Sequence, residues 1–166
     1  AALERAGIVR QDLTAIAVGV GPGPFTGLRV GLVTARTLAF VLELPVYGVC
    51  SLDVLAAEAA TTIDGAFVVA TDARRKEVYL ASYEDGVRVD GPVVERPATL
   101  ATELPVVGEG GALYPADFPA HTGPHRPSAG WLARVVTEEL AELHDPDPMY
   151  LRRPDAVAPS SPKKVS

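Results

Sequence analysis

Three glycines lie at a predicted strand-to-helix turn, a position in which phosphate groups are often bound. Gly21, Gly23 and Gly27 lie between an apolar segment and a helix, where N–H groups at the helix N-terminus can hold an anion. The spacing has one residue more than the dinucleotide fingerprint, and the Lys-Ser/Thr ending of a P-loop is missing. Pro22 and Pro24 also remove two N–H donors. We therefore favour a rigid turn that orients the helix, and we keep Gly21 and Gly23 as candidate nucleotide-binding residues.

A third candidate nucleotide contact is Asp72, which precedes Arg74 and Arg75 at a predicted hairpin turn. A carboxylate and two guanidinium groups at this turn could bind a nucleotide. Asp is also a common first residue of turns, because its side chain accepts hydrogen bonds from nearby backbone N–H groups. We favour this second interpretation, in which the two arginines are solvated.

The histidines do not predict a metal site. His121 and His125 are four residues apart, but the prolines and glycines around them prevent the helix that would aim both rings at one metal ion. Cys50 has no histidine close in sequence that would activate it as a nucleophile. We therefore predict no metal ligand and no catalytic residue in this chain.

The segment after the glycine turn predicts a helix over residues 26–42, capped by Thr26 and ended before Pro45. At about 100° per residue, one face is apolar and should lie on a sheet. It carries Leu28, Leu32, Ala35, Ala39 and Leu42. The opposite face is also apolar, where a surface helix would carry charges. On this side we predict a partner interface made of Arg29, Val30, Val33, Thr34, Thr37 and Val41.

Small residues recur at four-residue intervals in this helix, and one of them, Gly31, disfavours helix formation. A glycine at this place is explained if another backbone comes close to it. Two neighbours remain open: a helix of this chain that ends at Gly7, or a helix of another chain.

Composition indicates a folded protein without a broad surface for nucleic acid. The 166 residues are 48% hydrophobic, and 21 acidic against 15 basic residues give a net charge of −6. Contact with RNA would therefore be local or shared with a partner. Arg29 and Arg36 interrupt the longest apolar stretch, so no membrane-spanning helix is predicted. Cys50 is the only cysteine, which suits a reducing compartment, and the cytoplasm is the expected location.

The order of the predicted elements indicates an α/β protein. Strands over residues 13–20 and 46–49 alternate with the first helix and with a second one capped by Ser51, as in a parallel sheet. We predict the remainder of a first α/β lobe over residues 1–63, a second lobe over residues 64–151 and an extended tail over residues 152–166.

The second lobe is predicted to begin with an antiparallel meander. Its strands cover residues 67–71, 78–83 and 87–95, and Val106 and Val107 suggest another strand. Residues 108–127 are predicted to be a loop, followed by a C-terminal helix capped by Ser128. One face of that helix should carry Leu132, Val135, Val136, Leu140 and Leu143.

Several stretches of the chain resemble the bacterial TsaB (YeaZ) family. The longest is VGVGPGPFTGLRVGLVTARTLA over residues 18–39, followed by PVYGV from Pro45 and SLDVL from Ser51. DARRKEVY, from Asp72, is similar to the hairpin signature of that family, and YLR, from Tyr150, is similar to its closing motif. The resemblance extends over residues 16–152.

The resemblance implies an actin-like, sugar-kinase-like (ASKHA) fold and a role in making threonylcarbamoyladenosine in tRNA. It implies a non-catalytic scaffold that binds the catalytic paralogue TsaD through helices of the first lobe and helps to recruit the ATPase TsaE. ATP and metal would be bound by those partner subunits, with no cofactor in this chain, and tRNA would be contacted only within the complex. An exposed apolar helix face also makes a homodimer plausible.

One departure from the family pattern concerns the start of the chain. Family members open with a strand hairpin, a third strand and a helix, of which residues 1–6 alone have a counterpart here. We therefore expect a first lobe truncated at its N-terminus. Such a chain should be unable to make the normal partner interface, because half of the helix pair is missing and the first sheet keeps an exposed edge. Two other functions stay open: an ATP-binding enzyme of the actin-like ATPase or kinase fold, and a metallopeptidase-like protein.

Overall fold

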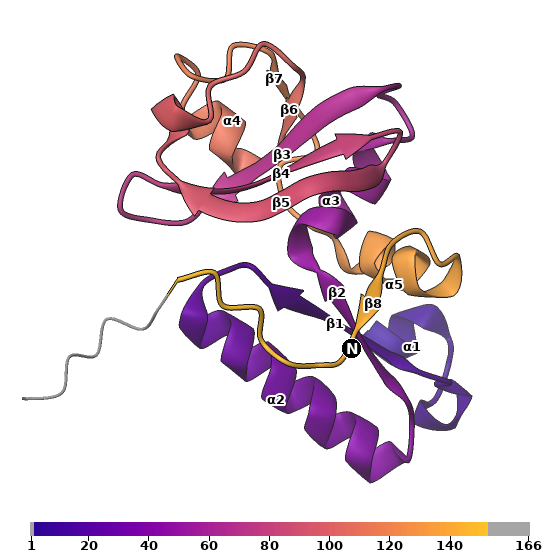
Figure 1. The fold of residues 1–166 in the computed structure, drawn as a ribbon. Coiled ribbons are helices and arrows are strands. Elements are labelled where there is room, and N and C mark those ends of the chain that lie inside the picture. Colours follow the sequence, from indigo (N-terminus) through magenta and orange to yellow (C-terminus); the bar gives the residue numbers. More distant parts are fainter. Residues whose placement is uncertain (1, 153–166) are drawn as a thin grey trace, which may run out of the picture.

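The structure is a computed structural model that describes residues 2–152, and it has two lobes with a helix between them (Figure 1). The chain starts with α1 (Ala2–Ala6) and the 3-10 turn η1 (Arg10–Asp12). It continues through β1 (Ile16–Gly21), α2 (Phe25–Leu42) and β2 (Val46–Cys50) of the first lobe. The helix between the lobes, α3 (Ser51–Ala59), follows β2 directly.

The first sheet has the strand order β1-β2-β8, where β8 is Leu143–His144. β1 and β2 are parallel, as predicted, and β8 pairs with β2 in the antiparallel direction. Val18 and Val20 of β1 are buried and pack with Leu32 and Ala35 of α2. The apolar segment therefore forms a strand that α2 covers on one face.

The second sheet has the order β5-β4-β3-β6-β7. Its strands are β3 (Ala66–Asp72), β4 (Val78–Glu84), β5 (Val87–Glu95), β6 (Val106–Val107) and β7 (His121–Thr122), with the 3-10 turn η2 (Pro97–Thr99) after β5. The first three form the predicted antiparallel meander, and β6 is parallel to β3.

The prediction of a loop over residues 108–127 is wrong, because this segment contains the helix α4 (Glu109–Leu113) and the strand β7. The helix α4 was not recognised from the sequence because two of its residues are glycines. A Cβ atom on Gly110 would lie 2.8 Å from the carbonyl oxygen of Ala70, and one on Gly111 would lie 2.7 Å from Cβ of His121. Glycine is therefore required for packing here, although it disfavours helix formation.

The largest core lies around α3. Leu52 and Leu55 of this helix are fully buried and belong to one cluster with Phe67, Tyr83 and Val107 of the second sheet. On the first-lobe side, Val54 packs with residues of β2 and of the C-terminal helix. No residue of α3 is exposed, so this helix is buried on all sides and holds the two lobes together.

The C-terminal helix α5 (Ala129–Thr137) packs on α3, β1 and β2, so the sequence expectation that placed it with the second lobe is corrected. Its predicted cap is confirmed, since Ser128 Oγ accepts a hydrogen bond from the Trp131 N–H at 3.2 Å. The helix is shorter than predicted: it ends at Thr137, and Leu143 belongs to β8.

The two other predicted caps are wrong. α2 begins at Phe25, with Pro24 at the capping position, and α3 begins at Ser51 itself, after Cys50. Neither helix has a side-chain hydrogen bond at its capping position.

Candidate protein interface and the cleft between the lobes

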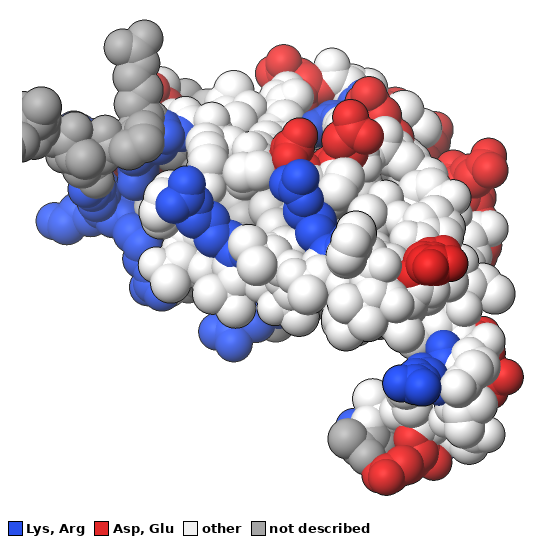
Figure 2. All heavy atoms as spheres, turned by 90° about the horizontal axis from the view of Figure 1, so that it is seen from below, with Lys and Arg blue, Asp and Glu red and all other residues white. Residues whose placement is uncertain are grey.

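The two faces of α2 differ in burial as the sequence pattern predicts. Leu32, Ala35 and Ala39 are buried against the sheet. On the opposite face the exposed fractions are 61% for Val30, 64% for Val33 and 68% for Val41. Thr34 and Thr37 beside them are also exposed, as is Arg29. We call this side of the helix the α2 face. In Figure 2 the side of the molecule that carries α2 is largely uncharged.

Sequence reasoning missed the most exposed apolar residue of the α2 face. Phe40 is 85% exposed, and it follows Val33 by seven residues, which is about two helical turns. Its ring therefore lies on the same side as Val33, and the helical period could have identified it. Phe25 at the start of the helix and Leu38 are also exposed.

The described part of the chain does not cover the α2 face. A Cβ atom built on Gly31 would meet nothing within 4 Å, and the same is true of Gly27. The alternative in which the helix ending at Gly7 packs against Gly31 is therefore wrong for residues 2–152. The small residues of this face remain accessible to a second chain.

The two arginines of α2 are held by a segment that we call the C-terminal strap, residues 145–152. Arg36 forms an ion pair of 3.0 Å with Asp147, and Arg29 Nε donates a hydrogen bond to the Tyr150 hydroxyl at 2.9 Å. The Tyr150 ring also stacks on Phe25 at 5.3 Å. The strap thus pairs with the polar edge of the helix, whose arginines stay exposed, and it leaves the apolar side open.

The strap also connects the two lobes. The Met149 N–H donates to the Val20 carbonyl of β1 at 2.7 Å, and the Met149 side chain packs against the cores of both lobes. Three residues later, Arg152 donates to the Ala73 carbonyl at 3.2 Å and forms an ion pair with Glu77. The position of α2 is therefore tied to the turn between β3 and β4.

By length and composition α2 is long and apolar enough to cross a membrane. By that criterion, which tolerates two charged residues, the prediction of no membrane-spanning helix is wrong. The helix has 18 residues and a mean hydropathy of 1.4, and 17% of it is buried. One such helix is weak evidence, because core helices of soluble proteins meet the same criterion. Here one face packs on a sheet, and Arg29 and Arg36 are paired within the chain.

A cleft of about 280 Å³ lies between the glycine turn and the second lobe. Gly23 and Asp72, two of the three candidate nucleotide contacts, line it, together with Arg74, His125 and Arg126 among others. The third, Gly21, does not line it: its φ is 102°, and a Cβ atom there would lie 3.1 Å from the Leu28 side chain. Gly21 is thus needed for the turn that shapes the cleft.

Asp72 is engaged by its own turn. Its Oδ1 accepts a hydrogen bond from the Arg74 N–H at 2.8 Å, and its Oδ2 forms an ion pair of 3.0 Å with the Arg74 guanidinium. These contacts agree with the turn role that we favoured for Asp72, but Arg74 is paired with Asp72 and is not only solvated. Of the histidines, His125 lines the cleft and His121 lies in β7. Within residues 2–152, no three His, Cys, Asp or Glu side chains are grouped to hold a metal ion.

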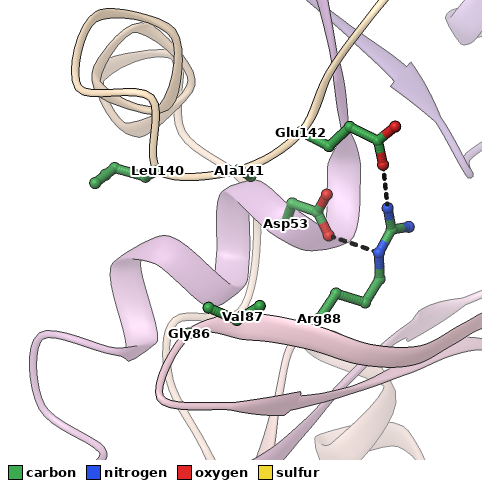
Figure 3. Close-up of a pocket in the computed structure, with 7 residues that line it drawn as sticks. All are labelled: Asp53, Gly86, Val87, Arg88, Leu140, Ala141 and Glu142. Carbon is green, nitrogen blue, oxygen red and sulfur yellow. Dashed lines mark ion pairs between the residues drawn. The ribbon is translucent and has the colours of Figure 1, made fainter.

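A buried polar cluster joins the lobes on another side, next to a second pocket of about 240 Å³ (Figure 3). Asp53 of α3 is almost fully buried, and its Oδ1 accepts a hydrogen bond of 2.7 Å from the Tyr83 hydroxyl. Arg88 of β5 lies 3.6 Å from Asp53 and 3.7 Å from Glu142, so its guanidinium bridges α3 and the segment before β8.

Burial dominates the titration of this cluster. Desolvation raises the pKa of Asp53, although the Tyr83 hydrogen bond and Arg88 oppose the rise. Burial and the neighbouring Asp53 charge raise the pKa of Tyr83. Burial also raises the pKa of the nearby Cys50 to about 11, so its thiol is protonated at neutral pH.

Sequence reasoning missed the cluster. Its one signal was Asp53, an acidic residue inside an otherwise apolar helix.

Comparison with known proteins agrees with this arrangement of lobes. The family model of TsaD, the tRNA N6-adenosine threonylcarbamoyltransferase, matches residues 1–108. An uncharacterized protein of Mycobacterium tuberculosis is 45% identical over 94% of this chain and 72% of its own length. The tRNA threonylcarbamoyladenosine biosynthesis protein TsaB of Bacillus subtilis is 33% identical over 89% of this chain and 73% of its length.

A solved structure from Pseudomonas aeruginosa, of a protein with similarity to the peptidase YeaZ, superposes with a TM-score of 0.75 at 29% identity. The match covers 91% of this chain and 79% of that one. Two α/β lobes that enclose a cleft at a glycine turn define a protein of the actin-like, sugar-kinase-like (ASKHA) fold class. Within that class, the chain belongs to the TsaB (YeaZ) family, whose named members are tRNA threonylcarbamoyladenosine biosynthesis proteins.

Proposed function

We propose that this chain acts in threonylcarbamoyladenosine modification of tRNA as an accessory subunit that binds a TsaD-type transferase through the α2 face. The observation that carries the proposal is the row of exposed apolar residues on one side of α2, Val30, Val33, Phe40 and Val41. An uncharged surface of this kind is typical of a protein interface.

The choice of a TsaD-type partner rests on the relation between the two proteins. Because the TsaD family model matches residues 1–108, a TsaD-type protein is expected to carry a counterpart of α2. Two related helices can pair about a pseudo-twofold axis, each presenting the same face to the other. Gly27 and Gly31 would allow the two backbones to come close. Arg29, Thr34 and Thr37 would form the polar border of that interface.

The proposal is tested by titrating the chain with its matching TsaD-type protein and measuring the dissociation constant. The variant Val33→Glu places a charge at the centre of the α2 face and should weaken binding at least about tenfold. Val89→Glu is the matched control, because Val89 is 63% exposed on β5 of the other lobe. Equal affinity of the two variants would contradict the proposal.

Other occupants of the α2 face are outcomes of the same experiment. If the chain forms a homodimer that TsaD does not dissociate, and Val33→Glu makes it monomeric, the face serves self-association and the proposal fails. A TsaE-type ATPase is expected to join only after the TsaD-type subunit. A titration in which TsaE binds the chain alone would contradict that order.

A second candidate function, ATP binding by this chain itself, is favoured by one observation. The cleft of about 280 Å³ brings Gly23 and Asp72 together with cationic side chains. Calorimetric titration with ATP distinguishes the two functions. Sub-millimolar binding by the chain without its partner, lost in Asp72→Asn, would favour an enzyme over an accessory subunit.

A further inference from the structure

The turn between β3 and β4 has an unusual backbone. Arg74, Arg75 and Lys76 have φ angles of 62°, 56° and 61°, so three consecutive residues with long side chains are in the left-handed region. Residues with a Cβ atom are unfavourable there, and a turn of ordinary structural purpose would use glycine or asparagine. Backbone strain of this kind is concentrated at functional sites.

The turn is held rigidly from both sides. Asp72 Oδ1 accepts a hydrogen bond from the Arg74 N–H at 2.8 Å, and the Glu77 N–H donates to the Arg74 carbonyl at 3.0 Å. From the strap, Arg152 donates to the Ala73 carbonyl and forms an ion pair with Glu77. The strained conformation is therefore fixed by its neighbours, which is what a preorganised binding surface requires.

The turn concentrates positive charge on an acidic protein. The chain has a net charge of −6, yet three successive cationic side chains are exposed here. Arg74 is paired with Asp72, but its side chain is still 80% exposed. Arg126, which is exposed and paired with Glu109, lies with Arg74 along the adjacent cleft. The turn projects to the left in Figure 1, and Figure 2 shows Lys and Arg side chains gathered on that side of the molecule.

We propose that the basic turn, residues 74–76, binds the phosphate backbone of the tRNA that the family modifies. Exposed cationic side chains on a rigid turn can exchange their present contacts, such as the pair of Arg74 with Asp72, for successive phosphates of a nucleic acid. A nucleotide would be enclosed instead and would use N–H donors, two of which Pro22 and Pro24 remove from the glycine turn. The inference rests on the role of the family in tRNA modification, and it does not depend on docking through the α2 face.

The location of the turn is compatible with a partner on α2. Tyr150 of the strap contacts Arg29 and Phe25 at the start of α2. Two residues later, Arg152 of the strap contacts Ala73 and Glu77. The basic turn therefore sits beside the end of the α2 face, and the two surfaces can be occupied together. In a complex, the strap residue Arg152 would act as a positioning residue that fixes the turn relative to the docked transferase.

The test measures binding of unmodified tRNA to the complex of the chain with its TsaD-type partner, as a function of salt. The variant Arg75→Asn with Lys76→Asn keeps residues that tolerate the left-handed region, so the turn can still form. We expect affinity to fall about tenfold, and the slope of log K against log salt to become shallower by about two, one for each phosphate that the variant no longer neutralises. Arg75→Lys with Lys76→Arg should restore both quantities.

The control is Arg5→Gln with Arg10→Gln, which removes two exposed cations from the α1 end of the molecule. This variant should keep the wild-type salt slope. Thermal unfolding checks that every variant is folded.

Wild-type affinity and wild-type salt slope in the Asn variant would overturn the proposal. The proposal would also fail if the Asn variant lost ATP binding while its salt slope for tRNA stayed unchanged. If no complex with the TsaD-type protein forms, docking is wrong, and the same titrations on the chain alone at low salt still decide the role of the turn.

Discussion

Replacing Tyr83 by phenylalanine tests whether the buried cluster holds the lobes together. The Tyr83 hydroxyl donates to Asp53 at 2.7 Å, and both side chains are almost fully buried. The substitution removes this hydrogen bond from a buried carboxyl group. The cation paired with that group, Arg88, is 3.6 Å away. Hydrogen bonds to charged groups contribute about 1.5–3 kcal/mol. We expect Tyr83→Phe to lower the free energy of unfolding by about 2 kcal/mol.

Urea denaturation at neutral pH measures this loss, and thermal unfolding should show a decrease of about 4–8 °C in Tm. Tyr79→Phe is a suitable control, because Tyr79 lies four residues earlier in the same strand and is half-buried. Its effect should stay below about 0.5 kcal/mol. In acid the loss for Tyr83→Phe should shrink, since Asp53 becomes protonated and a neutral hydrogen bond contributes about 1 kcal/mol. A loss below about 0.5 kcal/mol at neutral pH would refute the reasoning.

Three further predictions concern single side chains. Burial raises the pKa of Asp53 above 3.8, so the ionised form of this residue destabilises the fold as the pH rises. In thermal melts, the Tm of Asp53→Asn should therefore increase relative to that of the wild type as the pH rises from about 4 to about 7. Because Cys50 is fully buried and its thiol is protonated at neutral pH, it should react with a maleimide at about pH 7.5 only when the protein unfolds. In urea titrations, Gly110→Ala should destabilise by about 1–3 kcal/mol, whereas Gly31→Ala, in open space, should stabilise by up to about 1 kcal/mol.

Helical and strand periodicity predicted the elements in which apolar residues occupy the buried positions. Val18 and Val20 make an apolar strand, and Leu32, Ala35 and Ala39 make the buried side of α2. The exposure of Val30 and Val33 could be predicted because the period of a helix places them opposite the sheet. Phe40 was available to the same reasoning and was overlooked. Local pattern was therefore sufficient for β1, for β2 and for the two faces of α2, but not for the caps or for the packing of α5 and β8 on the first lobe.

Features that depend on contacts between distant segments could not be predicted. Gly110 and Gly111 indicate a loop by propensity, but close packing against Ala70 and His121 requires them in a helix. Asp53, Tyr83 and Glu142 come from three segments, and only the fold brings them to Arg88. The positive φ angles of the basic turn were equally hidden, because arginine and lysine give no sign of left-handed backbone.

The C-terminal strap has a consequence for the order in which the protein matures. Arg29 and Arg36 bond to residues 121 and 111 positions later in the chain. During synthesis, α2 leaves the ribosome long before Asp147 and Tyr150 exist, so its apolar side and its unpaired arginines are exposed together at that stage. We expect the finished α2 face, and assembly with a partner, to appear only when the last part of the chain has folded back, which makes nascent α2 a natural client of chaperones.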